Sequence, residues 1–218
     1  MPYDQAIFAD NEFYHIYNRG VEKRTTFMDD RDYQRFLQTL EYYRFKEPAA
    51  KFSARNRPSL KSTNQNEETI VEIICFCLMP NHFHLILKQE SESGITKFIR
   101  KVLNSYTKYF NTKYSRVGPL FQGAFKAKHI EGNEQLIHLS RYIHLNPLID
   151  YLAKELVSYK HSSYSEFVGD KLGFCQTQYV LNQFTNPLDY QQFVLDQEDY
   201  GRSIKLLERA IPGEEKYV

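Results

Sequence analysis

Two apolar runs separated by a three-residue connection constrain the fold of this chain more than any other feature. Residues 71–78 read VEIICFCL, residues 82–87 read HFHLIL, and Met79-Pro80-Asn81 joins them. Short runs rich in β-branched and aromatic residues are typical of strands, and a Pro-Asn step is typical of a turn. The sequence therefore predicts two antiparallel strands joined by a tight connection.

The segments around this pair alternate between strand and helix patterns. Alternating apolar and aromatic residues predict strands over residues 13–17 and 125–130, and apolar residues at helical spacing predict helices over about 31–46, 94–113 and 134–145. The order β-α-β-β-α-β, followed by helices, is typical of the split βαβ arrangement. We therefore expect an α+β fold of the ferredoxin-like type, with an antiparallel sheet, two helices on one face and a C-terminal helical appendage.

Turn-forming and polar residues divide the chain further. We expect Asp29-Asp30 to cap the first helix, and Asn146-Pro147 to end the helix that starts near residue 134. The polar stretch over about 46–69 predicts a long mobile loop. The expected organisation is a main domain over residues 1–150 and an extension over 151–218, whose short helices include 178–184 and 203–210.

The composition indicates a globular chain, with 42% hydrophobic and 25% charged residues. The sequence contains no apolar run of membrane-spanning length, and its first residues lack the order of a signal peptide, so we expect a cytoplasmic protein without a membrane partner. Three cysteines, Cys75, Cys77 and Cys175, cannot form a disulfide framework. We interpret them as reduced core thiols.

Positive charge is concentrated in one segment although the whole chain carries a net charge of only +1. Residues 97–128 contain eight basic residues and no acidic residue, so the rest of the chain carries a net charge of −7. These residues are Lys97, Arg100, Lys101, Lys108, Lys113, Arg116, Lys126 and Lys128. Such a cluster indicates a polyanionic partner such as nucleic acid, although a solvated helix face produces the same pattern.

The motif His82-Phe83-His84 is the sharpest candidate for chemistry. Residues two apart on a strand point to the same face, so both imidazoles are expected to project together and to supply half of a divalent metal site. A chance pair of strand histidines is the alternative. Tyr106 lies in the apolar stripe of the basic helix, and Tyr109 lies at the edge of that stripe. If the stripe faces the sheet, either phenol could approach the histidines. The default interpretation of each is an ordinary core tyrosine.

Six segments, in order and spacing, resemble the single-tyrosine transposases of the insertion-sequence 200/605 type, and especially the REP-associated tyrosine transposases. They are YHIYNRG (residues 14–20), CLMPNHFHLIL (77–87), SYTKYFN (105–111), GPLFQG (118–123), YIHLNP (142–147) and SSY (162–164). Together they span about residues 13–168. The resemblance identifies residues 1–150 as a catalytic domain of the His-hydrophobe-His nuclease class.

The resemblance implies an enzyme that cuts and rejoins single-stranded DNA near hairpins. His82 and His84 would hold Mg²⁺ or Mn²⁺, and a helix tyrosine, Tyr106 with Tyr109 as the runner-up, would attack the scissile phosphate and form a 5′-phosphotyrosine. Asn18, Arg19 and the eight basic residues of 97–128 are the expected DNA contacts. The expected partner is single-stranded or hairpin DNA, bound by a monomer or a homodimer.

Two departures from the family pattern leave parts of this assignment open. One helical turn after Tyr106 stands Phe110 where insertion-sequence relatives have a Gln metal ligand, and Ala124 follows Gly123 where REP-associated relatives usually have an Arg. The third metal ligand is therefore unassigned. Two alternatives to a strand transferase are a hairpin-binding module that no longer cuts and a rolling-circle replication nuclease.

Overall fold

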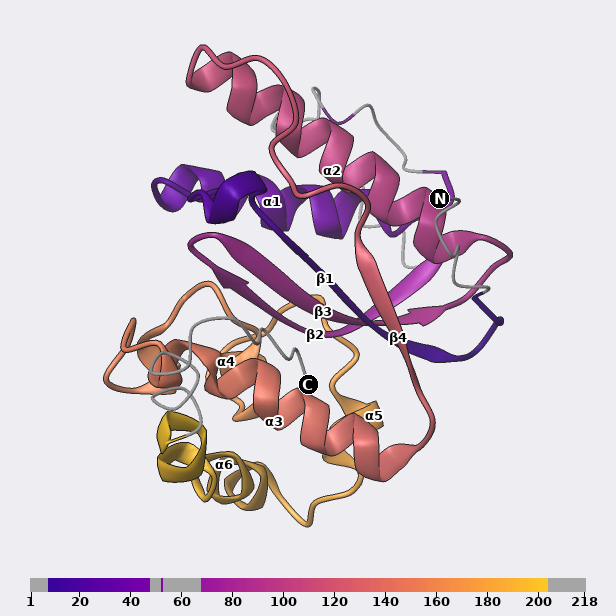
Figure 1. Ribbon diagram of the computed structural model, residues 1–218. Coiled ribbons are helices and arrows are strands. Elements are labelled where there is room, and N and C mark those ends of the chain that lie inside the picture. The colour runs from indigo at the N-terminus through magenta and orange to yellow at the C-terminus, as the bar shows by residue number, and fades with distance from the viewer. Residues whose placement is uncertain (1–7, 48–51, 53–67, 204–218) are drawn as a thin grey trace. The chain divides into compact units, whose positions relative to one another are not determined.

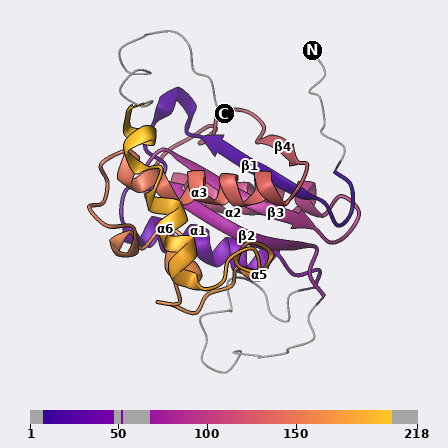
Figure 2. The same ribbon diagram turned by 90° about the horizontal axis from the view of Figure 1, so that it is seen from below.

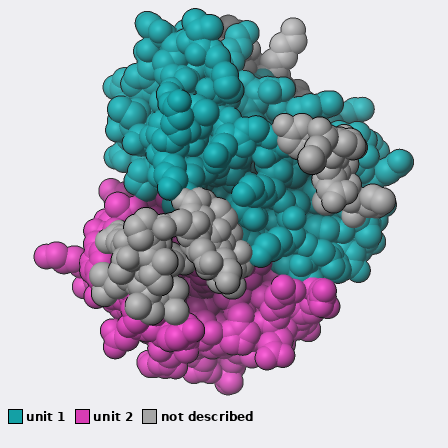
Figure 3. Space-filling model, viewed as in Figure 1, with its two compact units in different colours: residues 1–74, 80–130 teal, residues 75–79, 131–218 magenta. Residues whose placement is uncertain are grey.

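The structure is a computed structural model that describes residues 8–47, 52 and 68–203. The chain forms two compact units (Figure 3). The first comprises residues 1–74 and 80–130, and the second comprises residues 75–79 and 131–218. Strand β2 (Val71–Met79) contributes its beginning to the first unit and its end to the second.

Within the described residues the sheet has four strands in the order β2-β3-β1-β4. Strand β1 (Phe13–Arg19) pairs antiparallel with both β3 (His82–Gln89) and β4 (Lys126–Ile130). Helices α1 (Asp30–Tyr43) and α2 (Gly94–Lys113) lie side by side on one face of the sheet in the first unit (Figure 1). This arrangement confirms the expected ferredoxin-like α+β fold.

The helix layer is held to the sheet by a stripe of apolar side chains on each helix. On α1 the Asp29 carboxylate accepts a hydrogen bond from the Asp32 backbone N–H, which caps the helix as expected. The Phe36 ring of α1 lies 5.2 Å from that of Phe83 on β3 and 5.0 Å from that of Tyr106 on α2. All three rings are fully buried, so this contact forms the centre of the first core.

The polar stretch expected as a mobile loop lies almost wholly outside the described residues, at positions 48–51 and 53–67. Its two ends are described, and they are joined through the backbone. Lys46 N–H donates to Glu68 O at 2.9 Å, and Ile70 N–H donates to Arg44 O at 2.8 Å. Phe45 and Thr69 form an antiparallel bridge between these bonds. The segment therefore leaves and rejoins the fold at neighbouring points.

The second unit is mostly helical, and its main helix departs from the expectation at its end. The expected stop at Asn146-Pro147 is wrong, because α3 runs over Asn133–Ile149 with Pro147 inside it. Proline removes only one backbone donor, and here it falls in the last turn, where buried Leu145 and Leu148 hold the helix in place. The Asn146 side-chain amide also donates to Tyr142 O at 2.9 Å.

Shorter elements follow α3. They are the 3-10 turn Leu156–Ser158 and helices α4 (Tyr164–Phe167), α5 (Gln178–Leu181) and α6 (Pro187–Leu195). Another 3-10 turn, Val21–Lys23, belongs to the first unit. Helix α6, which was not expected from the sequence, begins with Pro187 after the capping residue Asn186 and lies against α3 (Figure 2). The expected helix over 203–210 lies outside the described residues except at Ser203.

A buried polar network joins α3, α4, α6 and the end of β2 within the second unit. The imidazole of His144 is hydrogen-bonded through Nδ1 to the Tyr190 hydroxyl at 2.7 Å and through Nε2 to Ser163 Oγ at 2.9 Å. Ser163 Oγ also accepts from Phe76 N–H at 2.9 Å. Burial lowers the pKa of His144 to about 3, so the ring is neutral at pH 7.

Two further sequence expectations concern the cysteines and the membrane. Cys75 and Cys77 are buried free thiols, and Cys175 is a partly buried free thiol. None of the helices in the described part of the chain is long and apolar enough to cross a bilayer.

Replacing His144 by Gln should flatten the pH dependence of stability. The unfolded imidazole takes up a proton near pH 6.5, well before the folded one, so its contribution is complete above that pH and is lost as the pH falls toward 3. The wild-type protein should lose up to about 1.4 kcal/mol of unfolding free energy per pH unit through this group, and His144→Gln should not. Urea unfolding followed by circular dichroism at pH 7 and pH 5 measures this difference.

His138→Gln is the matched control, because His138 lies exposed on the same helix. An unchanged pH dependence in His144→Gln would show that the buried ring does not couple folding to protonation.

Candidate functional site

Strand β3 presents two chemically different faces. Phe83 lies between the two histidines of the motif and points into the helix layer, where its ring contacts Phe36 of α1. Side chains alternate along a strand, so His82 and His84 project from the opposite face. Their ring centroids lie 5.1 Å apart, which confirms that the pair shares one side of the sheet. We call this the histidine face.

Strand β1 adds a third imidazole and a phenol to the histidine face. Tyr17 is paired with His84 in the antiparallel register, and His15 is paired with Ile86. Directly opposite residues share a face, and the stacked rings agree with this: the His15 ring centroid lies 4.8 Å from that of Tyr17 and 5.1 Å from that of His84. His15 and His84 are buried, whereas His82 and Tyr17 are partly exposed.

Hydrogen bonds fix the orientation of both motif histidines through the same ring nitrogen. His82 Nδ1 lies 2.6 Å from Asn81 Oδ1, and His84 Nδ1 lies 2.9 Å from His15 Nε2. Burial, reinforced by the positive charge of Lys128, lowers the pKa of His15 to about 4, so at pH 7 its neutral ring can accept a hydrogen bond. With both Nδ1 atoms engaged, a metal would bind through the Nε2 atoms, an arrangement typical of metal-binding histidines.

The residues present fit a divalent metal only in part. Two adjacent imidazoles with oriented rings are suitable nitrogen ligands. Among the described residues, however, no group of three or more His, Cys, Asp or Glu side chains is placed to hold one ion. The third ligand left open by the sequence therefore remains unassigned, and phosphate oxygens or water would complete the coordination.

Two of the predicted DNA-contacting lysines lie on the histidine face. In the register of β4 with β1, Lys126 is paired with Tyr17 and Lys128 with His15, so both point to this side. Both are exposed, and Lys126 Nζ lies 5.9 Å from the centroid of the Tyr17 ring. This edge of the sheet thus carries positive charge beside the imidazoles, where it can attract a phosphate.

The other predicted contacts are distributed differently. Asn18 is buried on the helix-covered face, since it is paired with Phe83, whereas Arg19 is paired with His82. Four basic residues stand exposed on α2, namely Lys97, Arg100, Lys101 and Lys108. Arg116 donates to the side chain of Asn111 and to Pro119 O. The basic residues of 97–128 are therefore divided between the histidine face and the helix-covered side of the first unit, and they do not form one continuous surface.

Tyr106 faces the sheet from α2, as its place in the apolar stripe predicts, but it lies on the side opposite to the motif histidines, so its phenol does not approach them. Its ring packs in the core on the helix-covered side of the sheet, and the histidines project from the other side. The Tyr106 hydroxyl is fully buried and donates to Thr26 O at 2.5 Å. Burial, with the negative charge of Asp32 nearby, raises the pKa of this phenol far above its usual range.

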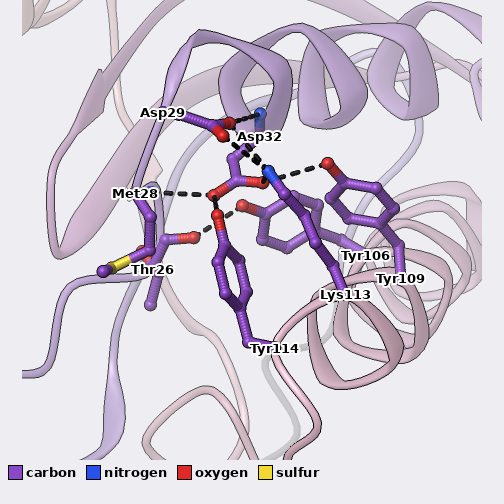
Figure 4. A network of polar contacts seen from close by, with 8 residues as sticks. All are labelled: Thr26, Met28, Asp29, Asp32, Tyr106, Tyr109, Lys113 and Tyr114. Carbon is purple, nitrogen blue, oxygen red and sulfur yellow. Dashed lines mark hydrogen bonds and ion pairs between the residues drawn. The ribbon is translucent and has the colours of Figure 1, made fainter.

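Tyr109, the runner-up, lies on the same helix-covered side and belongs to a polar network around Asp32 (Figure 4). Asp32 is fully buried and accepts hydrogen bonds from four donors. They are the Tyr109 hydroxyl at 3.0 Å, Lys113 Nζ at 2.7 Å, the Tyr114 hydroxyl at 2.8 Å and Met28 N–H at 2.8 Å. The network ties the end of α2 to the start of α1.

Lys113, predicted as a DNA contact, is the cation of this network. Its ammonium also donates to both carboxylate oxygens of Asp29 at 2.8 Å. Desolvation acts against the charged form, but the hydrogen bonds to Asp29 and Asp32 outweigh it and raise the pKa of Lys113. Its charge is therefore balanced within the protein.

The sequence patterns did not reveal two contributors. His15 was not among the predicted site residues, although its spacing from Tyr17 places both on one strand face. Asp32 was not identified at all, because a single acidic residue in a first helical turn is ordinary. The sequence also gives no sign that Tyr109, Lys113 and Tyr114 are the side chains that bind Asp32.

The chain is similar to known transposases both in sequence and in fold. The family model described as "Transposase IS200 like" matches residues 43–146. A solved structure described as a REP-associated tyrosine transposase bound to a REP hairpin matches with a TM-score of 0.55 and 17% sequence identity. The match covers 79% of this chain and 92% of that chain. No curated protein sequence matches this chain. The expected resemblance is thereby confirmed.

Replacing Asp32 by Asn should destabilise the first unit by about 3 kcal/mol, because one ammonium and two phenols would lose their common buried anionic acceptor. Asp30→Asn is the matched control, since Asp30 is an exposed carboxylate in the same helical turn, and its effect should stay within about 0.5 kcal/mol. Urea unfolding at pH 7 measures both. Equal stability of the two variants would contradict the structural role of Asp32.

Proposed function

Since residues 43–146 match the IS200-like transposases and the fold matches a REP-associated tyrosine transposase, we propose that this chain is a metal-dependent DNA transposase that cuts and rejoins single-stranded DNA at hairpin-associated sites. The observation that carries the proposal is the histidine face, where His82 and His84 are oriented through Nδ1 by Asn81 and His15. Hairpin DNA is the partner of the solved relative, and its extension to this chain is part of the proposal.

In this mechanism His82 and His84 would hold Mg²⁺ or Mn²⁺, which when bound polarises the scissile phosphate. His15 keeps the His84 ring in place, and the exposed lysines Lys126 and Lys128 bind neighbouring phosphates. A tyrosine oxygen attacks phosphorus, the bond from phosphorus to the 3′-oxygen breaks, and a free 3′-hydroxyl leaves. The product is a 5′-phosphotyrosine, and attack by a 3′-hydroxyl reverses the step and reseals a strand.

The attacking tyrosine is proposed by elimination among the helix tyrosines of the family-like segments. Tyr106 and Tyr109 lie on the helix-covered side of the sheet, behind the strand that carries the histidines. Tyr164 is almost fully buried on α4, and burial raises its pKa to about 12. Tyr142 on α3 is partly exposed and lies within the stretch that the family model matches. We therefore propose Tyr142 as the nucleophile in place of Tyr106.

The oligomeric state and the cytoplasmic location expected from the sequence stay predictions. A hairpin-binding module without cleavage activity would retain the basic edge of the sheet but would not need oriented imidazoles. Assays for DNA cleavage and for a covalent protein–DNA adduct distinguish the two, because only a strand transferase should give both products.

Replacing His82 or His84 by Ala should reduce cleavage of a hairpin oligonucleotide with a single-stranded flank by at least about a hundredfold in Mn²⁺, because each change removes a metal ligand. DNA affinity should change little, since the lysines remain. Gel-based cleavage assays and fluorescence anisotropy measure the two quantities. His129→Ala is the control, because His129 is exposed on β4 and pairs with Glu12. Wild-type cleavage rates in both motif variants would exclude the metal proposal, and no cleavage by the wild type would favour the binding module.

The covalent DNA adduct should form on Tyr142. Tyr142→Phe removes the attacking oxygen and keeps the ring, so the adduct should disappear while the fold survives. Tyr109→Phe, which changes a partly exposed phenol on the other side of the sheet, should retain it. Mass spectrometry of the digested adduct locates the modified residue, and DNA on Tyr106 or Tyr109 would overturn this assignment while preserving the transesterification mechanism.

A further inference from the structure

A groove runs between α1 and α2 in the first unit, on the side of the sheet away from the motif histidines. It encloses about 790 Å³. Two of its lining residues come from α1 and seven from α2. They are Arg35, Tyr43, Lys101, Asn104, Ser105, Lys108, Tyr109, Thr112 and Lys113. The proposed transposase chemistry uses none of these residues.

The groove carries excess positive charge. Four lining residues are cationic and none is acidic. Lys113 is balanced by Asp29 and Asp32, but Arg35, Lys101 and Lys108 make no ion pair with any described residue. Three cations facing one hollow create a field that favours an anionic ligand.

The spacing of the α2 residues fits an extended ligand better than a small anion. Lys101, Lys108 and Thr112 follow one another along one side of the helix, and at 1.5 Å per residue they span about 16 Å. Asn104 and Ser105 lie between them and offer hydrogen-bonding groups. A strand of DNA advances by about 3.4 Å per nucleotide in a duplex, so this length corresponds to several phosphates.

Aromatic rings complete the lining. Tyr43 and Tyr109 face the groove from its two helices, and the Tyr109 hydroxyl is held by Asp32 (Figure 4). The guanidinium carbon of Arg35 lies 5.3 Å from the Tyr109 ring centroid and 4.2 Å from that of Phe52. Rings interleaved with cations are the combination by which proteins bind unpaired bases and their phosphates.

We propose that the α1–α2 groove is a second nucleic-acid site, which binds a single-stranded DNA segment on the side of the sheet opposite to the histidine face. This inference rests on the proposed function for the identity of the polymer. A DNA that occupies both sites must pass around an edge of the sheet. The groove would therefore hold a single-stranded flank away from the scissile phosphate.

The test compares two double variants that remove the same charge. Lys101→Gln with Lys108→Gln changes the groove, whereas Lys154→Gln with Lys171→Gln changes exposed cations that neither line it nor belong to the predicted DNA contacts. Fluorescence anisotropy with a labelled oligothymidylate of about 15 nucleotides measures affinity over a range of salt concentrations. The groove variant should bind about tenfold more weakly. Its salt slope should fall by about 1.4, because each of the two lysines neutralises one phosphate and each neutralised phosphate adds about 0.7 to the slope.

The control variant should keep affinity within about twofold and an unchanged salt slope. Equal weakening in both variants would overturn the groove proposal and would indicate a diffuse basic surface instead. Unchanged binding in both variants would also overturn the groove proposal. Tighter binding of oligouridylate than of oligothymidylate by the wild type would overturn DNA as the ligand. If the wild type cleaves no DNA, the proposed function fails. The affinity comparison still tests whether the groove binds single-stranded DNA.

Discussion

The alternation of side chains along β3 is the constraint on which the candidate site depends. Phe83 is buried against α1, and this fixes His82 and His84 on the other side of the sheet. A shift of register by one residue would place both imidazoles in the apolar core beneath the helices and move Phe83 to the opposite face of the sheet. The hydrophobic core thus determines where the chemistry is placed, and β1 and β4 extend the same face with His15, Lys126 and Lys128.

The helix layer is fixed by a different kind of interaction. Asp32 is fully buried and holds one ammonium and two phenols, which come from the end of α2 and the residue after it. Removing a charge from water is costly, so such a group stabilises the fold only when its acceptor sites are filled, as they are here. The same bonds fix Tyr109 and Lys113 at one end of the α1–α2 groove. One carboxylate therefore links the packing of the helices to the shape of the proposed second site.

Much of the architecture was predictable from local patterns. The paired apolar runs, the alternation of strands and helices, and the cap at Asp29 all follow from short-range rules, and the motif histidines were placed together correctly. The position of Tyr106 was not predictable in this way. Its place in an apolar stripe shows that it faces the sheet, but the stripe does not say which face the helix covers. That depends on Phe83, which lies in another element.

Other differences arise from contacts between segments far apart in the sequence. Pro147 was expected to end α3, yet the buried leucines around it keep the helix intact for two more residues. His15 gains its importance only when β1 pairs with β3. Asp32 becomes a centre of contacts only when α2 packs beside α1. Pattern analysis of single segments cannot anticipate such partners.

The backbone bridge between residues 44–46 and 68–70 has a consequence for how chains of this kind can vary. Both ends of the intervening segment are fastened to each other by the fold, so its length can change without pulling on α1 or β2. Doubling a closed loop costs only about 0.6 kcal/mol in chain entropy. Insertions and deletions are therefore far cheaper here than inside the sheet, and this is the position at which a lineage can acquire or discard whole stretches of sequence while the scaffold persists.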